Sequence, residues 1–122
     1  MRILIIDDEK AIADTLVLII RNAGYDAIAA YDGATALQLV SAQCPDVILC
    51  DIIMPGMNGI EVCKRIKAEH PRCQILLSSG QAATNDLIAE ARTDGYDWEL
   101  LAKPVNPREL LSQLASIAAS AA

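Results

Sequence analysis

Short apolar runs alternate along the chain with segments whose apolar residues recur at helical spacing. The runs are almost continuously apolar, which is typical of parallel strands that are covered on both faces of a sheet. We therefore predict five strands, at residues 3–6, 27–30, 47–50, 74–78 and 99–102.

Two of the helical patterns are apolar stripes with recognisable ends. One stripe is formed by Ile12, Leu16, Ile19 and Ala23, and it stops at Gly24.

The second stripe comprises Val62, Cys63 and Ile66, and it ends at His70 before Pro71. We interpret His70 as an ordinary helix-end residue, where a cation favours the helix dipole, and not as a phosphohistidine.

The last two helical segments differ in how clearly they begin. Residues 106–109 (Asn-Pro-Arg-Glu) supply an N-cap, a proline at the first helical position and an acid at the third, and Leu110, Leu114 and Ile117 are expected to face inward. Residues 82–93 are also expected to be helical, with only Leu87, Ile88 and Ala91 to bury.

Strands that alternate with helices predict a doubly wound α/β sheet with five helices, in one domain spanning residues 1–122. Ligands of such sheets bind beyond the carboxyl ends of the strands, so the residues that end each strand are candidates for the functional site. These are Asp7-Asp8, Asp51, Ser78-Ser79-Gly80 and Lys103-Pro104.

Three carboxylates, a hydroxyl and an ammonium are therefore expected at one edge of the sheet. Carboxylates crowded together repel each other unless a cation neutralises them, and oxygen ligands select a hard ion such as Mg²⁺. A metal, Lys103 and the Ser79 hydroxyl around Asp51 suit phosphoryl transfer, in which a carboxylate attacks the phosphorus atom.

The amino-acid composition indicates which kinds of partner the protein binds and in which cellular compartment it is found. With 53% hydrophobic and 21% charged residues and a net charge of −6, the chain is typical of a globular protein without a direct nucleic-acid partner. Its four cysteines lack zinc-type spacing and are expected to be reduced thiols; Cys50 is expected to pack in the core. The first apolar run is too short for a signal peptide or membrane span, so we expect a cytoplasmic protein.

The strand-end residues carry a family resemblance. The chain resembles the receiver domains of two-component response regulators over essentially its whole length, through DD at 7–8, D-x-x-M-P-G-M-N-G at 51–59, SG at 79–80 and KP at 103–104. Each pair alone is weak, but four in this order are specific. The resemblance implies a flavodoxin-like sheet with strand order 2-1-3-4-5. It does not settle whether the chain is a stand-alone receiver or is cut from a longer protein.

The resemblance also implies roles for individual residues. Asp51 would be the phosphoacceptor. Asp8 would bind Mg²⁺ directly and Asp7 mainly through water, with the backbone carbonyl of Ile53 as a further ligand.

Further roles fall to the hydroxyl and the ammonium. Ser79 would hydrogen-bond the phosphoryl group and Lys103 would pair with another of its oxygens. Lys103 would also precede a cis peptide bond to Pro104.

The resemblance further implies partners. A histidine kinase or histidine phosphotransfer protein would donate the phosphoryl group. A downstream protein would bind the surface formed by the fourth helix, fifth strand and fifth helix. We expect a phosphorylation-controlled switch with autocatalytic phosphotransfer and dephosphorylation, not an enzyme that turns over a substrate.

The chain departs from the family at its switch residues. Leu100 stands where the family has a Tyr or Phe, and the segment before Lys103 is one residue longer than usual. In a regular strand Trp98 would face the same way as Leu100, about 6.6 Å away. We predict that a bulge shifts this register and that Trp98 partly replaces the missing aromatic ring.

Two other functions remain as alternatives. A Mg²⁺-dependent phosphohydrolase of the haloacid-dehalogenase type would need a second acid two residues after Asp51, where this chain has Ile53. A nucleotide or flavin binder would need a glycine-rich phosphate loop, and none of the known patterns occurs. Asp7 and Asp8 could also simply begin the first helix.

Overall fold

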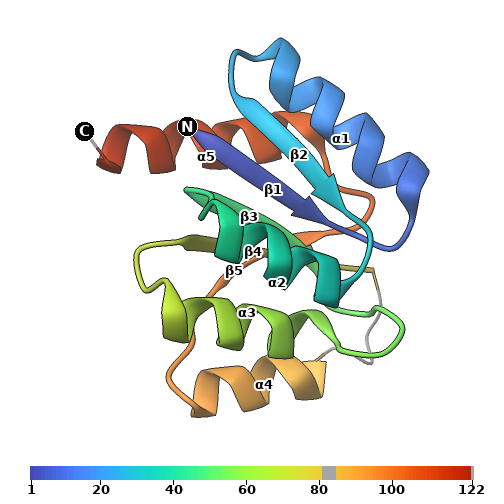
Figure 1. Cartoon of the computed structure of the whole chain (residues 1–122), viewed down its shortest axis with the longest axis vertical. Coiled ribbons are helices and arrows are strands. Elements are labelled where there is room, and N and C mark those ends of the chain that lie inside the picture. Colours follow the sequence, from blue (N-terminus) through green and yellow to red (C-terminus); the bar gives the residue numbers. More distant parts are fainter. Residues whose placement is uncertain (81–84, 122) are drawn as a thin grey trace.

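The computed structural model of the chain describes residues 1–80 and 85–121. Its centre is one parallel sheet with the strand order β2-β1-β3-β4-β5, shown in Figure 1. The strands are β1 (Arg2–Ile6), β2 (Asp26–Ala30), β3 (Val47–Asp51), β4 (Gln74–Ser79) and β5 (Glu99–Ala102). The predicted flavodoxin-like fold and its strand order are confirmed.

Helices cover both faces of the sheet (Figure 1). One face carries α1 (Lys10–Asn22) and α5 (Pro107–Ala121), and the other carries α2 (Gly33–Ala42), α3 (Gly59–Glu69) and α4 (Asn85–Thr93). The predicted helix at 82–93 is therefore observed from Asn85 onward, whereas residues 82–84 lie outside the described part of the chain.

Successive strand residues pack against opposite helical layers. In β3, Leu49 packs on the α1–α5 side, whereas Ile48 and Cys50 pack on the side of α2, α3 and α4. Because a strand presents its side chains alternately to two buried faces, both sets must be apolar, which explains the continuous apolar runs in the sequence. Cys50 has no exposed surface, as expected of a core residue.

The buried face of α1 differs from the predicted stripe. Ile12 is 38% exposed and Ala23 lies beyond the end of the helix, whereas the buried residues are Ala13, Leu16, Val17 and Ile20. The helix contains more apolar residues than one face can hold, so the sequence allows two buried stripes that are offset by one position. Packing against the sheet selects the stripe that contains Ala13, Val17 and Ile20.

Two helix ends agree with their predicted caps. Asn106 Oδ1 accepts hydrogen bonds from the backbone N–H groups of Arg108 and Glu109, at 2.9 and 3.3 Å, so α5 begins where its N-cap predicted. His70 is the C-cap of α3, and its backbone N–H donates to the carbonyl oxygen of Ile66 at 2.7 Å.

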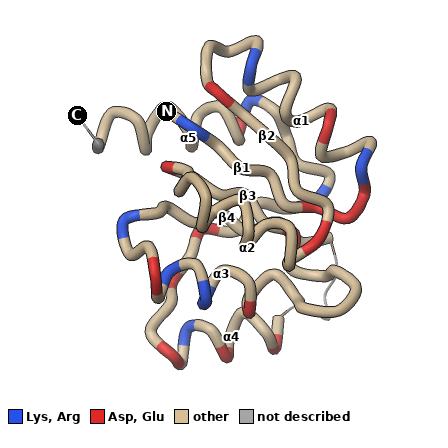
Figure 2. Tube along the Cα trace, viewed as in Figure 1, with Lys and Arg blue, Asp and Glu red and all other residues tan. Residues whose placement is uncertain are grey.

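Charged residues of both signs are interspersed over the helices and loops, as Figure 2 shows. Within residues 1–80 and 85–121, none of the helices combines the length and the apolar character that crossing a membrane requires.

Candidate functional site

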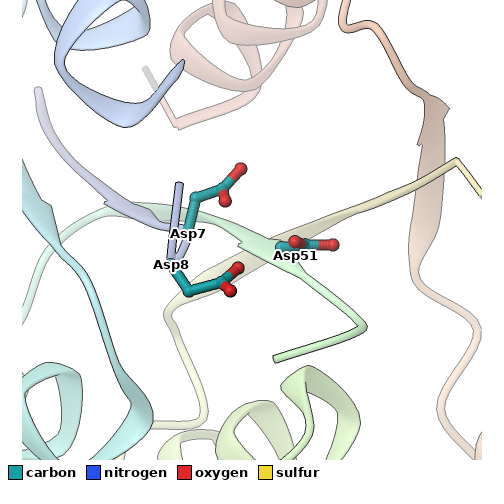
Figure 3. A group of neighbouring side chains, drawn as sticks. All are labelled: Asp7, Asp8 and Asp51. Carbon is teal, nitrogen blue, oxygen red and sulfur yellow. The ribbon is translucent and has the colours of Figure 1, made fainter. Parts of the chain in front are cut away.

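The acidic residues gather at the carboxyl edge of the sheet. Asp7 and Asp8 directly follow β1, and Asp51 is the last residue of the neighbouring β3. The chain order of the sheet reverses between these two strands, because β2 lies on one side of β1 and β3 on the other. Figure 3 shows the side chains of all three residues directed towards a shared space beyond the strand ends.

The three carboxylates form a compact group. Each contributes an oxygen that lies within 4.8 Å of the other two. Asp7 and Asp51 are buried, with 3% and 6% of their surface exposed, whereas Asp8 is open to solvent. Two buried acids at this separation repel each other, so the arrangement requires positive charge nearby.

Lys103 supplies a positive charge from the carboxyl end of β5, at the same edge of the sheet. Its Nζ donates to Asp51 Oδ2 at 2.9 Å and to Asp7 Oδ2 at 3.0 Å, with 17% of the lysine side chain exposed. The backbone positions this side chain: Lys103 N–H donates to the carbonyl oxygen of Ser79 at 3.0 Å, and the bond to Pro104 is cis, as the resemblance implied.

The electrostatic surroundings act on the two charged partners in different ways. Burial raises the pKa of Asp51, and the charge of Asp7 adds to this effect, although Lys103 and the N–H of Ile53 oppose it. Burial lowers the pKa of Lys103, but its hydrogen bonds to Asp51 and Asp7 outweigh burial and leave the pKa above its ordinary value. Lys103 is therefore fixed as a cation beside Asp51.

Local hydrogen bonds fix the orientation of Asp7. Its Oδ1 accepts the backbone N–H of Glu9 at 3.0 Å, and its own N–H donates to the carbonyl of Ala30 at 3.1 Å. These bonds direct the second oxygen, Oδ2, towards Lys103.

A cleft gives solvent and ligands access to Asp51. Its volume is about 350 Å³, and its lining residues are Asp8, Glu9, Asp51, Ile53, Gly80 and Lys103. Ser79 is half-buried at the end of β4, directly before the lining residue Gly80. Of the strand-end residues predicted from the sequence, Asp8, Asp51, Gly80 and Lys103 line this cleft, and Asp7 and Ser79 directly precede lining residues.

The residues present fit a hard divalent cation. Two of the three clustered carboxylates are buried, their oxygens are close enough to share one ion, and Asp8 is open to exchange with water. An all-oxygen donor set with solvent access is the type that Mg²⁺ prefers.

Gly59 belongs to the site, although the sequence reading assigned it no role. A Cβ atom at this position would lie 2.1 Å from the backbone carbonyl oxygen of Asp51. Only glycine lets the first turn of α3 approach so closely, and the N–H of Gly59 donates to the carbonyl of Ile52 at 2.8 Å. The available signal was the glycine that closes the M-P-G-M-N-G run.

The expected bulge near Lys103 is absent from the described strand. Residues 99–102 of β5 pair with 76–79 of β4 without interruption. Between α4 and β5, the Tyr96 and Trp98 rings stack at a centroid distance of 4.7 Å. Trp98 packs against the core layer that contains Leu77, and Leu77 is the β4 residue in register with Leu100. Trp98 and Leu100 therefore lie on the same face of the sheet. The switch roles of both residues stay predictions.

Sequence and structure comparisons now define the family. A family model described as the response regulator receiver domain matches residues 3–115. The chain belongs to the response regulator receiver family. It is thus a receiver domain of two-component signalling, a class that acts through phosphorylation-controlled switching.

Solved structures agree with this assignment. A response regulator from Chloroflexus aurantiacus is 32% identical, with 97% of each chain covered and a TM-score of 0.82. A CheY-like receiver domain protein from Methanospirillum hungatei is 30% identical, covering 94% of this chain and 90% of that one, with a TM-score of 0.86. The chemotaxis protein CheY4 of Vibrio cholerae is 29% identical, with coverage of 95% and 97% and a TM-score of 0.84.

Proposed function

We propose that the receiver accepts a phosphoryl group on Asp51 from a phosphohistidine and thereby changes its binding to a downstream protein. The observation that carries this proposal is the contact between Asp51 and Lys103 at the base of an open cleft flanked by Asp7 and Asp8. A carboxylate that is held beside a fixed cation, yet is reachable through a cleft, is suited to attack phosphorus.

The transfer is a single displacement. An oxygen of Asp51 bonds to phosphorus while the bond between phosphorus and the donor's imidazole nitrogen breaks, and the leaving imidazole retains or takes up a proton. Lys103 turns from Asp51 to the phosphoryl oxygens and offsets their charge, and the Ser79 hydroxyl donates to another of them.

Asp7, Asp8, Asp51 and the carbonyl of Ile53 would hold Mg²⁺. When bound, the ion supplies positive charge next to the phosphoryl oxygens and relieves the repulsion among the carboxylates. Hydrolysis by water entering the same cleft would return the receiver to its resting state.

The donor is a histidine kinase or a histidine phosphotransfer protein, and we place its contact beside the cleft. An apolar groove of about 610 Å³ lies between α1 and the segment that follows β5, and it shares Glu9 and Lys103 with the cleft. A helix lying in this groove would bring its histidine close to Asp51.

The groove can be tested with two substitutions on one helix. Ile12 lines the groove and is 38% exposed, whereas Leu18 lies outside the groove and is 60% exposed. Ile12→Glu should slow phosphotransfer from a cognate histidine kinase but not uptake from acetyl phosphate, which requires no docking. Leu18→Glu should alter neither, and equal effects of the two substitutions on kinase transfer would rule out the groove.

The downstream protein would bind the surface of α4, β5 and α5. Leu100 is 39% exposed on β5, the edge strand, and so offers an apolar contact on that surface.

The alternative function considered from the sequence, a phosphohydrolase, lacks support at the position two residues after Asp51. Ile53 stands there with 40% of its surface exposed, and it cannot act as a general acid.

The decisive experiment compares the wild type with Asp51→Asn. Incubation with acetyl phosphate and Mg²⁺ should add one phosphoryl group to the wild type and none to the variant, as measured by intact-protein mass spectrometry. Asparagine keeps the shape of the side chain but lacks the anionic nucleophile. Labelling of a folded Asp51→Asn chain at the wild-type rate would refute the assignment.

A further inference from the structure

Two of the chain's four cysteines meet at the edge of the sheet opposite the phosphorylation cleft. Cys44 lies between α2 and β3, and Cys73 directly precedes β4. Both therefore stand at the amino ends of adjacent strands, whereas the cleft lies at the carboxyl ends. None of the chemistry proposed for Asp51 uses these thiols.

The backbone holds the two segments together. Val47 pairs with Gln74, and the N–H of Gln74 donates to the carbonyl oxygen of Asp46 at 2.9 Å. Cys44 lies three residues before Val47 and Cys73 one residue before Gln74, so the two cysteines stand on the two segments that enter this strand pair. Each thiol donates to the carbonyl oxygen of the following residue, Cys44 to Pro45 at 3.4 Å and Cys73 to Gln74 at 3.8 Å, and Cys44 is near enough to raise the pKa of the Cys73 thiol.

The two thiols differ in their exposure. Cys44 is exposed, whereas Cys73 has only 2% of its surface exposed. Burial raises the pKa of Cys73 to about 12, and the charge of Cys44 adds to this effect. The ammonium of Lys67 lowers the pKa of Cys73 and so opposes the rise; it donates to the carbonyl oxygen of Cys73 at 2.6 Å. Cys44 is therefore the thiol that a soluble oxidant reaches, and Cys73 is its buried neighbour.

We propose that Cys44 and Cys73 form a reversible disulfide when the protein meets a peroxide. The Cys44 thiolate attacks one peroxide oxygen and becomes a sulfenic acid, while the second oxygen leaves as hydroxide and takes up a proton to form water. The sulfur of Cys73 then displaces the sulfenic hydroxyl, which leaves with the Cys73 proton as a second water molecule. Two thiols are oxidised, one peroxide is reduced, and a dithiol reductant reverses the change.

The bond would enclose the segment that carries the phosphoacceptor. Residues 44–73 include all of β3, with Asp51 at its end, and all of α3. A cross-link across this segment restricts the unfolded chain more than the folded one, so oxidation should raise the melting temperature. The cleft itself is untouched, because the cysteines lie at the other end of the strands.

The other two cysteines provide an internal comparison. Cys50 on β3 and Cys63 on α3 belong to the same core layer, and Cys63 is near enough to raise the pKa of the Cys50 thiol, but neither has any exposed surface. An oxidant reaches Cys44 without unfolding the protein, whereas it reaches Cys50 and Cys63 only when the core opens. Oxidation of the folded protein should therefore stop at one disulfide.

Treatment of the reduced protein with hydrogen peroxide tests the proposal. The mass should fall by about 2 Da, for the two hydrogens lost in forming one disulfide, and peptide mapping should find Cys44 joined to Cys73. The melting temperature should rise and return to its starting value with dithiothreitol. Acetyl phosphate should still label the oxidised protein, so this test is independent of the proposed function.

Variants make the outcome unambiguous. Cys44→Ser changes an exposed side chain, so it should fold normally, form no internal disulfide and show no rise in melting temperature. Cys73→Ala should leave Cys44 as a sulfenic acid or a mixed disulfide, and Cys63→Ala should keep the cross-link. A Cys50–Cys63 bond, a dimer joined through Cys44, or four intact thiols in the wild type would each overturn the proposal.

Discussion

Lys103 and Asp51 are 52 residues apart in the chain, yet their charged atoms lie 2.9 Å apart. The same ammonium also reaches Asp7 at 3.0 Å, so one cation serves two buried acids that come from different strands. A single side chain thus joins the ends of β1, β3 and β5. This shared ion pair makes the site sensitive to the loss of one positive charge.

Lys103→Ala should lower the free energy of unfolding by about 2 kcal/mol in the absence of Mg²⁺. The substitution leaves two buried carboxylates without a cation, and partial exposure of the lysine keeps the loss below that of a fully buried pair. Urea denaturation measures the effect.

The matched control is Lys64→Ala, which removes a more exposed ion pair. The side chain of Lys64 is 28% exposed and that of its partner Asp94 is 49% exposed. That change should cost less than about 1 kcal/mol. Equal losses for the two variants would contradict the special position of Lys103.

Mg²⁺ should stabilise the wild type against heat, and Asp8→Ala should remove most of that effect. An ion that binds only the folded state raises stability by mass action. Without the metal, Asp8→Ala relieves repulsion in the cluster and should match or exceed the wild type. Differential scanning calorimetry with Mg²⁺ or EDTA measures both effects; an unchanged Mg²⁺ response in Asp8→Ala would place the metal elsewhere.

Asp51→Asn should raise the melting temperature of the metal-free protein at pH 7.5. Burial raises the pKa of Asp51 in the folded state, so the ionised carboxylate costs stability at any pH above that value. As the pH falls towards the ordinary value of 3.8, the carboxyl takes up its proton and the cost disappears. The difference between the variants should shrink on acidification, and a difference that grows would show the opposite pKa shift.

The sequence located the site better than it located the packing around it. Asp7, Asp8, Asp51 and Lys103 could be grouped because the carboxyl ends of parallel strands must share one edge. The buried face of α1 could not be chosen, because its apolar residues fit two adjacent stripes and only the sheet decides between them. The close approach of Gly59 to Asp51 could not be predicted from the sequence either, because it depends on where α3 lies on the sheet.

Gly59→Ala should destabilise the fold by about 3 kcal/mol, because the added methyl group meets backbone and not a movable side chain. Gly33→Ala is the control: Gly33 likewise begins a helix, but its Cβ would meet a side-chain atom, Cγ2 of Val62, at 2.8 Å, a milder clash than 2.1 Å against backbone. The control should cost less, about 1 kcal/mol. Chemical denaturation of both variants measures the difference, and similar losses would show that α3 can move away from Asp51.

Trp98 is the only tryptophan of the chain. Its ring stacks on Tyr96 at an interplanar angle of 30°, where the chain passes from α4 to β5. Lys64 of α3 lies 5.9 Å from the Tyr96 ring centroid and binds Asp94 at 2.5 Å, so the aromatic pair is tied to α3 as well. A shift of β5 or α4 on phosphorylation would therefore change the surroundings of the indole.

Intrinsic fluorescence should change when Mg²⁺ and beryllofluoride, a mimic of the phosphoryl group, are added together to the wild type. Asp51→Asn should show no change, because the mimic has no carboxylate to bind. Tyr96→Leu removes the stacking partner and should reduce the wild-type response without preventing occupancy of the cleft. If fluorescence stays constant while calorimetry shows the mimic bound, Trp98 is a fixed anchor between α4 and β5, and the switch must pass through Ser79 and Leu100 alone.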